Sequence, residues 1–328
     1  MASAGPLQLR WRPYRFALPQ AMVTSQGAWR ERCGWLLRLQ SSAGALAWGE
    51  APAPPGDEQT LERALAQLPA QLPRPELEQR LPALPAGLAF ALGTALAELD
   101  GLGAAAAGGW RPAPASALLL PAGEAMLAAL ERALERALEQ AGPGPLTLKW
   151  KVAALDDGQE RRWLEQLLQR LPAGARLRLD ANGGWDRATA AAWANRLRGE
   201  ARLEWLEQPL SPDDQPGLAA LAARLPVALD ESLRQHPQLL AGGWAGWRVR
   251  RPALEGDPRP LLAALQARVP RLMLSTALET GIGRRLLEHL AALQADGPTP
   301  TAPGLAPGWR PPGPLFCRDP EQVWGAAA

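Results

Sequence analysis

The stretch RLRLDANGGWDRATAAAWANRLRGEARLEWLEQPLSPDDQPGLAALAARLPVALDES, residues 176–232, is the part of the chain that best indicates its fold. It holds three short, strand-like segments, at 176–180, 203–207 and 226–230, and a helical pattern at 187–197 separates the first two. Short apolar segments that alternate with amphipathic helices are typical of parallel strands joined by helices. Each segment ends in an acidic residue, namely Asp180, Glu207 or Asp230.

The same alternation continues on both sides of this stretch. Further strands are expected at 116–120, 146–152, 247–251 and 271–275, with a weak eighth near 299–305, and further helices at 123–140, 159–171 and 281–293. Regular alternation over this length predicts an α/β fold of the (β/α)8 barrel type.

The N-terminal part follows a different pattern. Strand-like alternation at 8–12, 35–39 and 45–50 predicts an antiparallel meander, with a polar loop at 24–34 and helices near 57–68 and 86–103. We therefore expect three regions: an α+β domain at 1–110, a βα barrel at 111–310, and a C-terminal segment at 311–328 that packs back on the first domain.

The three strand-end carboxylates predict a metal site. In a βα barrel, successive strand ends lie side by side on the rim where such barrels carry their active sites. Three oxygen ligands without His or Cys favour Mg²⁺ or a similar hard cation. Taken singly, Asp180 and Asp230 are more readily interpreted as helix caps, because Asp is a favoured residue at that position.

The two lysines of the chain, Lys149 and Lys151, support a catalytic interpretation. The chain has 33 arginines, and arginine cannot serve as a proton-transferring base. In the segment Leu146–Val152, strand alternation points both lysines to one face and Trp150 to the other. Two solvated charges on an edge strand would explain the pair alone, but a base beside a cation fits its position just before the metal strands.

Composition excludes several other functions. A length of 328 residues accommodates a barrel and a smaller domain, and the net charge of +2 indicates neither nucleic acid nor an acidic membrane as a partner. Cys33 and Cys317 have no metal or disulfide spacing, which favours a reducing cytoplasm. No secretory signal or membrane-spanning stretch is seen, and a monomer is plausible.

With these motifs, the chain resembles the enolase superfamily and, within its muconate-lactonising-like group, the o-succinylbenzoate synthase family. The resemblance covers most of the chain and rests on segments that are weak singly and specific together. They are Trp48-Gly49-Glu50, Lys149-Trp150-Lys151, Arg178-Leu179-Asp180-Ala181-Asn182, Glu207-Gln208-Pro209, Asp230-Glu231-Ser232, Ser275-Thr276-Ala277-Leu278-Glu279 and Pro303-Gly304-Leu305.

The resemblance implies a modified barrel with an N-terminal capping domain, and Mg²⁺, or Mn²⁺, held by the three carboxylates. It implies a syn dehydration of 2-succinyl-6-hydroxy-2,4-cyclohexadiene-1-carboxylate to o-succinylbenzoate, in menaquinone or phylloquinone synthesis. Lys151 would take the α-proton and return it to the departing hydroxide, while Lys149 would tune Lys151 or hold the carboxylate. Substrate contacts are expected from Arg178, Ser275, Thr276, Gly304 and, in the capping loop, Thr24 and Arg30. For Arg178, an ion pair inside the barrel is an equal alternative.

One position departs from the family pattern. Arg251, before Pro252, stands where the family has a second lysine at the end of the sixth strand. An arginine can stabilise an intermediate, including by a cation–π contact, but is a poor base. Dehydration, which needs one base, therefore ranks above racemisation or epimerisation, which needs two. The register leaves open whether Arg250 or Arg251 faces inward.

Alternatives remain for the activity of the protein and for the role of one helix N-terminus. Another superfamily enzyme (a cycloisomerase, an N-acylamino acid racemase or a dipeptide epimerase) would use similar motifs, and a barrel that has lost activity could serve as a binding protein. Gly281 and Gly283 open the helix after the seventh strand, and its N-terminus could receive a substrate carboxylate or serve only packing.

Overall fold

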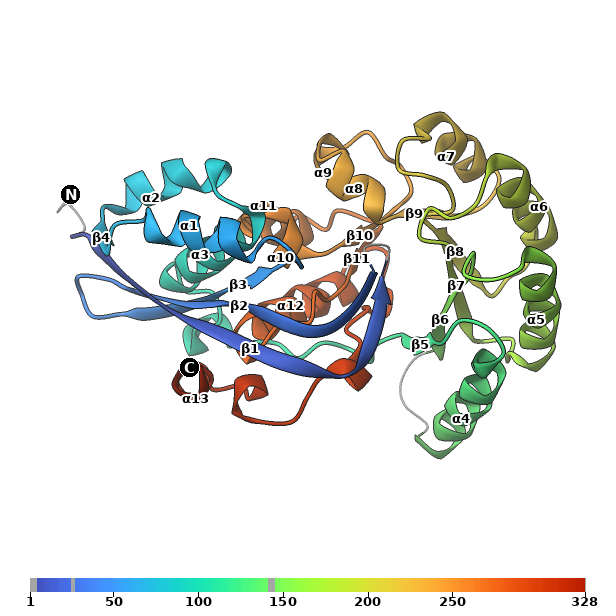
Figure 1. Ribbon diagram of the computed structural model, residues 1–328, viewed down its shortest axis with the longest axis horizontal. Coiled ribbons are helices and arrows are strands. Elements are labelled where there is room, and N and C mark those ends of the chain that lie inside the picture. Colours follow the sequence, from blue (N-terminus) through green and yellow to red (C-terminus); the bar gives the residue numbers. More distant parts are fainter. Residues whose placement is uncertain (1–4, 25–26, 141–144, 328) are drawn as a thin grey trace. The chain divides into compact units, whose positions relative to one another are not determined.

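The computed structural model describes residues 5–24, 27–140 and 145–327. The chain divides into two compact units (Figure 1). Unit 1 comprises Met1–Pro114, Arg250–Pro270 and Leu274–Ala328, and unit 2 comprises Ala115–Val249 and Arg271–Met273.

A seven-stranded sheet, whose order follows the chain from β5 to β11, organises unit 2. The strands are β5 (Leu118–Leu120), β6 (Thr147–Lys151), β7 (Arg176–Asp180), β8 (Leu203–Glu207), β9 (Val227–Leu229), β10 (Trp247–Arg250) and β11 (Leu272–Leu274). Its helices are α4 (Ala125–Gln140), α5 (Asp157–Arg170), α6 (Arg187–Leu197), α7 (Gln215–Ala222), α8 (Glu231–Gln235) and α9 (Gln238–Ala241). Neighbouring strands from β5 to β10 pair in parallel, which confirms the predicted α/β class.

The two faces of this sheet are buried differently. Helices α4 to α7 lie along one side of β5 to β9 (Figure 1). On the helix side, the buried Trp150 of β6 packs near Trp193 of α6, which stacks on Trp185 at a centroid distance of 4.8 Å. A separate cluster of Trp205, Ala228, Val249 and Met273 forms the apolar core of the other face. Residues two apart in a strand share a face, so this inner face also carries the lysines of β6.

The predicted eighth strand is absent from the described chain. Residues 299–305 contain no strand, and their link to the sheet region is an isolated bridge between Ser275 and Gly304. Pro300 and Pro303 explain the difference, because a proline has no N–H to donate to a ladder. The apolar character of the segment therefore reflects burial rather than strand pairing.

Unit 1 is built on a four-stranded sheet of order β3-β2-β1-β4. The strands are β1 (Leu7–Thr24), β2 (Gly27–Gln40), β3 (Leu46–Ala53) and β4 (Gln71–Leu72). The helices are α1 (Glu58–Ala66), α2 (Arg74–Arg80), α3 (Ala86–Leu99), α10 (Pro252–Glu255), α11 (Arg259–Gln266), α12 (Gly281–Ala295) and α13 (Pro320–Ala326), with short 3₁₀ turns at Leu81–Ala83, Ala105–Ala107, Pro307–Trp309 and Pro314–Phe316.

The expectation of a loop over 24–34 was wrong. Strand β2 already begins at Gly27, and it pairs with β1 from Thr24↔Gly27 onward. Gly27 has φ +106°, a conformation that favours glycine at such a turn. The polar side chains of this segment reflect the exposure of one end of the hairpin, while its backbone groups are satisfied by the ladder.

Helix α3 forms the centre of the unit 1 core, and residues Gly87–Ala97 are all buried. It packs on β3 so closely that a Cβ at Gly49 would lie 2.0 Å from the Ala91 carbonyl oxygen. In the part of the chain that the structure describes, no helix is both long enough and apolar enough to cross a membrane.

The N-terminus of α12 is filled by a carboxylate of the chain itself. Glu50 of β3, 0% exposed, accepts hydrogen bonds from the backbone N–H groups of Thr280 and Gly283, at 2.9 Å each, and from the hydroxyls of Thr280 and Tyr14, at 2.5 and 2.7 Å. A Cβ at Gly283 would lie 2.8 Å from the Glu50 Oε2 atom. The glycine therefore allows this close approach, and the helix N-terminus stabilises Glu50 rather than receiving a substrate carboxylate.

The C-terminal part of unit 1 packs on the first strand. Phe316 meets Phe16 edge-to-face at 4.8 Å, and Trp324 of α13 meets Trp48 of β3 edge-to-face at 5.5 Å. Val323 belongs to the same apolar cluster. Aromatic contacts of this kind each contribute about 0.5–1.5 kcal/mol beyond the burial of area.

Candidate active site

A row of charged residues crosses three adjacent strands of unit 2. In the parallel register, Lys151 of β6 stands opposite Asp180 of β7, which stands opposite Glu207 of β8. The next partner in the row is Ala228 of β9, and Asp230 follows it by two residues. Because residues in register point to one face, the strand pairing brings one amine and the carboxylates to the same edge of the inner face.

Lys149 lies between two of these carboxylates. Its Nζ atom is 2.8 Å from Asp180 Oδ2 and 2.6 Å from Glu207 Oε1. The lysine side chain is 14% exposed and its partners are 2% and 0% exposed. Strand β6 lies inside the sheet, between β5 and β7. The interpretation of the lysines as solvated charges on an edge strand is therefore wrong.

Glu207 lies in the most heavily buried part of the site. Burial raises the pKa of Glu207, the Lys149 ammonium opposes that rise, and the negative charges of Asp180 and Asp230 add to it. Its second oxygen accepts a hydrogen bond of 3.2 Å from the indole N–H of Trp205. A buried carboxylate beside two others is stabilised only by a cation in their midst, and here the Lys149 ammonium provides that charge.

The helix-cap interpretation fails for both aspartates. Asp186, not Asp180, caps α6, where its side chain accepts from the Thr189 N–H. Asp230 precedes α8 without a side-chain cap hydrogen bond. Asp180 Oδ1 instead accepts from the backbone N–H of Asn182 at 3.0 Å. Neither carboxylate is therefore explained by the local needs of a helix end.

The donor set of the site fits a hard divalent cation. In the described residues, no group of three or more His, Cys, Asp or Glu side chains is by itself arranged as a metal centre. The Lys149 ammonium bridges Asp180 and Glu207, and Asp230 contributes to the same negative potential. The carboxylate oxygens of this site thus already surround one cation, the Lys149 ammonium. Carboxylate oxygens are also the ligands that Mg²⁺ prefers.

Gln208 fixes the strand ends that carry two of the carboxylates. Its Oε1 atom accepts from the backbone N–H groups of Asp230, at 3.2 Å, and Ser232, at 3.0 Å. Its amide nitrogen donates to the Leu210 carbonyl, at 3.0 Å, and to the Ser232 hydroxyl, at 2.8 Å. Gln208 is 0% exposed and has φ +38°, so β8 and β9 are tied together just beyond Glu207.

The loop after the lysine strand is held in a similar way. Glu160 of α5, also 0% exposed, accepts from the backbone N–H groups of Ala153, Ala154 and Leu155 at 2.8, 3.0 and 3.1 Å. Burial raises the pKa of Glu160, and the three hydrogen bonds oppose that rise. Neither Gln208 nor Glu160 was identified from the sequence. Gln208 stood inside the quoted Glu207-Gln208-Pro209 motif, which was the available signal.

Arg178 lies on the same face as the row, one alternation before Asp180. It is fully buried, its Nε atom is 2.6 Å from Glu204 Oε2, and its guanidinium lies 4.2 Å from the centroid of the Trp205 ring. These contacts correspond to the ion-pair alternative for Arg178. Lys149 is the register partner of Arg178, so the contact between the Arg178 guanidinium and the Trp205 ring lies beside Lys149.

Four further predicted residues come together in unit 1. The Arg251 guanidinium donates to the Thr276 carbonyl at 2.9 Å, and the Thr276 N–H donates to the Gly304 carbonyl at 3.0 Å. The Ser275 hydroxyl reaches the same Gly304 carbonyl at 3.4 Å. Arg250 is instead paired with Glu255 at 2.7 Å, so the two arginines have different partners.

The two residues predicted in the capping loop are less defined. The side chain of Thr24 lies outside the described part of the chain. Arg30 is exposed on β2 and lines a cavity of about 560 Å³ with Trp29, Glu31 and Arg32.

The chain is similar to several known proteins. Residues 129–241 match the family described as enolase C-terminal domain-like. The o-succinylbenzoate synthase of Thermosynechococcus vestitus (strain NIES-2133 / IAM M-273 / BP-1) is 38% identical over 298 residues, which cover 87% of this chain and 88% of that protein.

Two solved structures extend the comparison. The o-succinylbenzoate synthase of Thermosynechococcus elongatus BP-1, complexed with magnesium in its active site, matches with a TM-score of 0.80 and 33% identity, over 97% of this chain and 99% of that one. The L-Ala-D/L-Glu epimerase of Bacillus subtilis matches with a TM-score of 0.69 and 22% identity, over 90% of this chain and 89% of that one, and shares the fold.

Proposed function

Because this chain belongs to the o-succinylbenzoate synthase family, within the enolase superfamily, we propose that it catalyses the Mg²⁺-dependent syn dehydration of 2-succinyl-6-hydroxy-2,4-cyclohexadiene-1-carboxylate to o-succinylbenzoate, a step of menaquinone or phylloquinone synthesis. The observation that carries the proposal is the row of Lys151, Asp180 and Glu207 in register across β6, β7 and β8.

Asp180, Glu207 and Asp230 are the residues that would hold the metal. Mg²⁺ bound there supplies positive charge that makes the proton on the carbon beside the substrate carboxylate more acidic. Lys149, which bonds to two of these carboxylates, balances their charge and would tune Lys151 or help hold the substrate carboxylate. Gln208 and Glu160 keep the strand ends and the following loop in place.

Lys151 is the proposed base and, in the second step, the proposed acid. Its neutral amine removes the α-proton, and the electron pair of the C–H bond is delocalised onto the substrate carboxylate, which gives an enediolate intermediate. That pair then forms the new ring double bond as the C–OH bond breaks, and the Lys151 ammonium gives its proton to the departing hydroxide, so that water leaves. One residue on one face performs both transfers, which makes the elimination syn and generates the aromatic ring.

Arg251 is proposed to stabilise the intermediate rather than to act as a second base. An arginine keeps its positive charge and can contact the face of a ring. Its hydrogen bond to Thr276, together with the bond from its backbone N–H to Glu255 at 2.6 Å, restrains the guanidinium. A racemase or epimerase needs a base on each face, so this residue favours dehydration.

Substrate contacts are proposed for Ser275, Thr276 and Gly304, supported by their mutual hydrogen bonds, and for Thr24 and Arg30 at the succinyl arm. Arg178 is also proposed to line the substrate site, from its position beside Lys149 and against the Trp205 ring.

We further propose residues 1–110 as the capping domain, 111–310 as the barrel and 311–328 as a segment that returns to the capping domain, supported by the contacts of Phe316 and Trp324. The proposed setting is a cytoplasmic enzyme without a nucleic-acid or membrane partner, supported by two free cysteines and a net charge of +2.

The test is turnover of 2-succinyl-6-hydroxy-2,4-cyclohexadiene-1-carboxylate by purified protein, with Mg²⁺ and with EDTA. We expect o-succinylbenzoate to form with the metal and not with the chelator. An N-acylamino acid and a dipeptide, assayed in parallel, report racemase and epimerase activity. A folded, Mg²⁺-binding protein that turns over one of these and not the dehydration substrate would overturn the proposal.

A further inference from the structure

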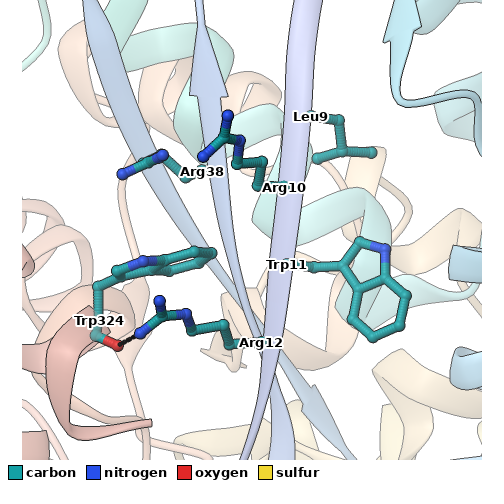
Figure 2. Close-up of a pocket in the computed structure, with 6 residues that line it drawn as sticks. All are labelled: Leu9, Arg10, Trp11, Arg12, Arg38 and Trp324. Carbon is teal, nitrogen blue, oxygen red and sulfur yellow. Dashed lines mark hydrogen bonds between the residues drawn. The ribbon is translucent and has the colours of Figure 1, made fainter.

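Three arginines gather on one face of the β1–β2 hairpin in unit 1. Arg10 and Arg38 are directly opposite partners across the two strands, and Arg12 follows Arg10 by two residues on the same face. Figure 2 shows these three side chains on one side of β1 together with Trp324, while Leu9 and Trp11 point to the other side. We call Arg10, Arg12 and Arg38 the arginine face.

Trp324 holds two of these arginines in place. The Arg12 guanidinium lies 4.8 Å from the centroid of the Trp324 ring and that of Arg38 lies 5.3 Å from it. Figure 2 shows the two guanidinium groups on opposite sides of the ring. Arg12 also donates to the Trp324 carbonyl at 3.0 Å, and Trp324 itself is anchored edge-to-face on Trp48. The cations are therefore positioned by aromatic contacts, which leave most of their N–H donors available.

The arginine face has no carboxylate partner among the described residues, since neither the ion pairs nor the hydrogen bonds of Arg10, Arg12 and Arg38 include one. Elsewhere in unit 1 arginines are neutralised, as Arg74 is by Asp100 at 2.6 Å. Like charges directly opposite each other across two strands destabilise a sheet. Three cations on one face, without a carboxylate partner among the described residues, therefore create a local positive potential that a bound anion would relieve.

The shape of the surface fits a small ligand. The three arginines, with Leu9, Trp11 and Trp324, line a cavity of about 460 Å³. Guanidinium groups bind phosphate oxygens with pairs of parallel hydrogen bonds. The faces of Trp324 are already covered by Arg12 and Arg38, so recognition would come from charge and hydrogen bonding rather than from stacking on a planar ligand.

We propose that the arginine face is a binding site for a small, soluble anion that carries phosphate groups, such as a phosphate ester or a diphosphate. The site is separate from the carboxylates of unit 2 and does not depend on the proposed dehydration. Its ligand is held by Arg10 and Arg38 from the paired strands and by Arg12 from the far side of Trp324.

The test is isothermal titration of the full-length protein with inorganic diphosphate, in EDTA and at about 0.15 M salt, where unspecific surface attraction is screened. Arg10→Gln and Arg38→Gln are compared with Arg63→Gln, which removes an exposed arginine of α1 in the same unit. We expect saturable binding by the unmodified protein and by the Arg63 variant, and at least about tenfold weaker binding by the other two, since each loses a charge-assisted contact.

The absence of saturable diphosphate binding would overturn the proposal, as would equal binding by all three variants with folding verified by circular dichroism. Binding to vesicles that contain phosphatidylglycerol without binding to free diphosphate would also overturn it and would assign the face to a membrane surface. Sulfate, titrated in parallel, is expected to bind at least about tenfold more weakly than diphosphate because it carries less charge, and equal affinity would refute phosphate recognition.

Discussion

Replacement of Gln208 by alanine is predicted to weaken Mg²⁺ binding through the backbone rather than through a ligand. The substitution removes four hydrogen bonds and leaves the buried N–H groups of Asp230 and Ser232 without their acceptor. Each unsatisfied buried group costs about 1–3 kcal/mol, so we expect a loss of about 2–6 kcal/mol in the free energy of unfolding, at the lower end if water enters. Loss of a residue that orients a metal ligand typically lowers metal affinity about 10–100-fold.

The chain offers a matched control in Gln294 of α12. This glutamine is also buried, donates to the Thr299 carbonyl at 2.6 Å and accepts from the Thr301 N–H at 3.4 Å, and it lies in unit 1. Urea unfolding and isothermal titration with Mg²⁺ are measured for both variants. Gln208→Ala and Gln294→Ala should both lose stability, and only the first should lose affinity for Mg²⁺. Unchanged Mg²⁺ affinity in a folded Gln208→Ala protein would refute the reasoning.

Three further predictions concern unit 1. Glu50→Ala leaves the donors of Thr280, Gly283 and Tyr14 unpaired, so urea unfolding should show a loss of about 3–5 kcal/mol, and a loss below about 1 kcal/mol would contradict the anchoring role of Glu50. Burial raises the pKa of Glu98, the partner of Arg285, from 4.5 to about 7. Because the folded state then binds the proton more tightly, the stability that Glu98 contributes is present below about pH 4.5 and is lost as the pH rises to about 7, by up to about 3 kcal/mol. Between about pH 4.5 and 7, the free energy of unfolding should therefore fall less steeply with pH in Glu98→Gln than in the unmodified protein. An identical slope in the two proteins would contradict the raised pKa of Glu98. Arg251→Lys should retain at least about a tenth of the dehydration rate, since a cation remains, whereas Arg251→Met should lose about 10²-fold or more, as measured by steady-state turnover.

The sequence indicated the barrel strands because their alternation is regular. Strands β7 and β8 begin and end at the predicted residues, and the opposite orientations of Trp150 and the two lysines followed from the same period of two. The segment at 299–305 was misassigned because its apolar residues are buried without pairing, and the polar start of β2 was taken for a loop because only its side chains face water.

What could not be predicted depends on contacts between distant segments. Glu50 meets Thr280 across 230 positions, and Gln208 meets Ser232 only because β8 and β9 are neighbours. No local pattern distinguishes such buried polar residues from surface ones. In the same way, the sequence predicted that Lys149 and Lys151 share a face of one strand, but the bridge from Lys149 to both Asp180 and Glu207 requires the register of three strands.

The most direct test of the account is the dehydration rate of Lys151→Ala, measured together with its affinity for Mg²⁺. The account predicts that turnover of 2-succinyl-6-hydroxy-2,4-cyclohexadiene-1-carboxylate falls by about 10³-fold or more, because Lys149, the other lysine of that face, is ion-paired with Asp180 and Glu207, while Mg²⁺ still binds to the carboxylates. Lys151→Ala protein that binds Mg²⁺ and turns over the substrate at the unmodified rate would contradict the assignment of Lys151 as the base.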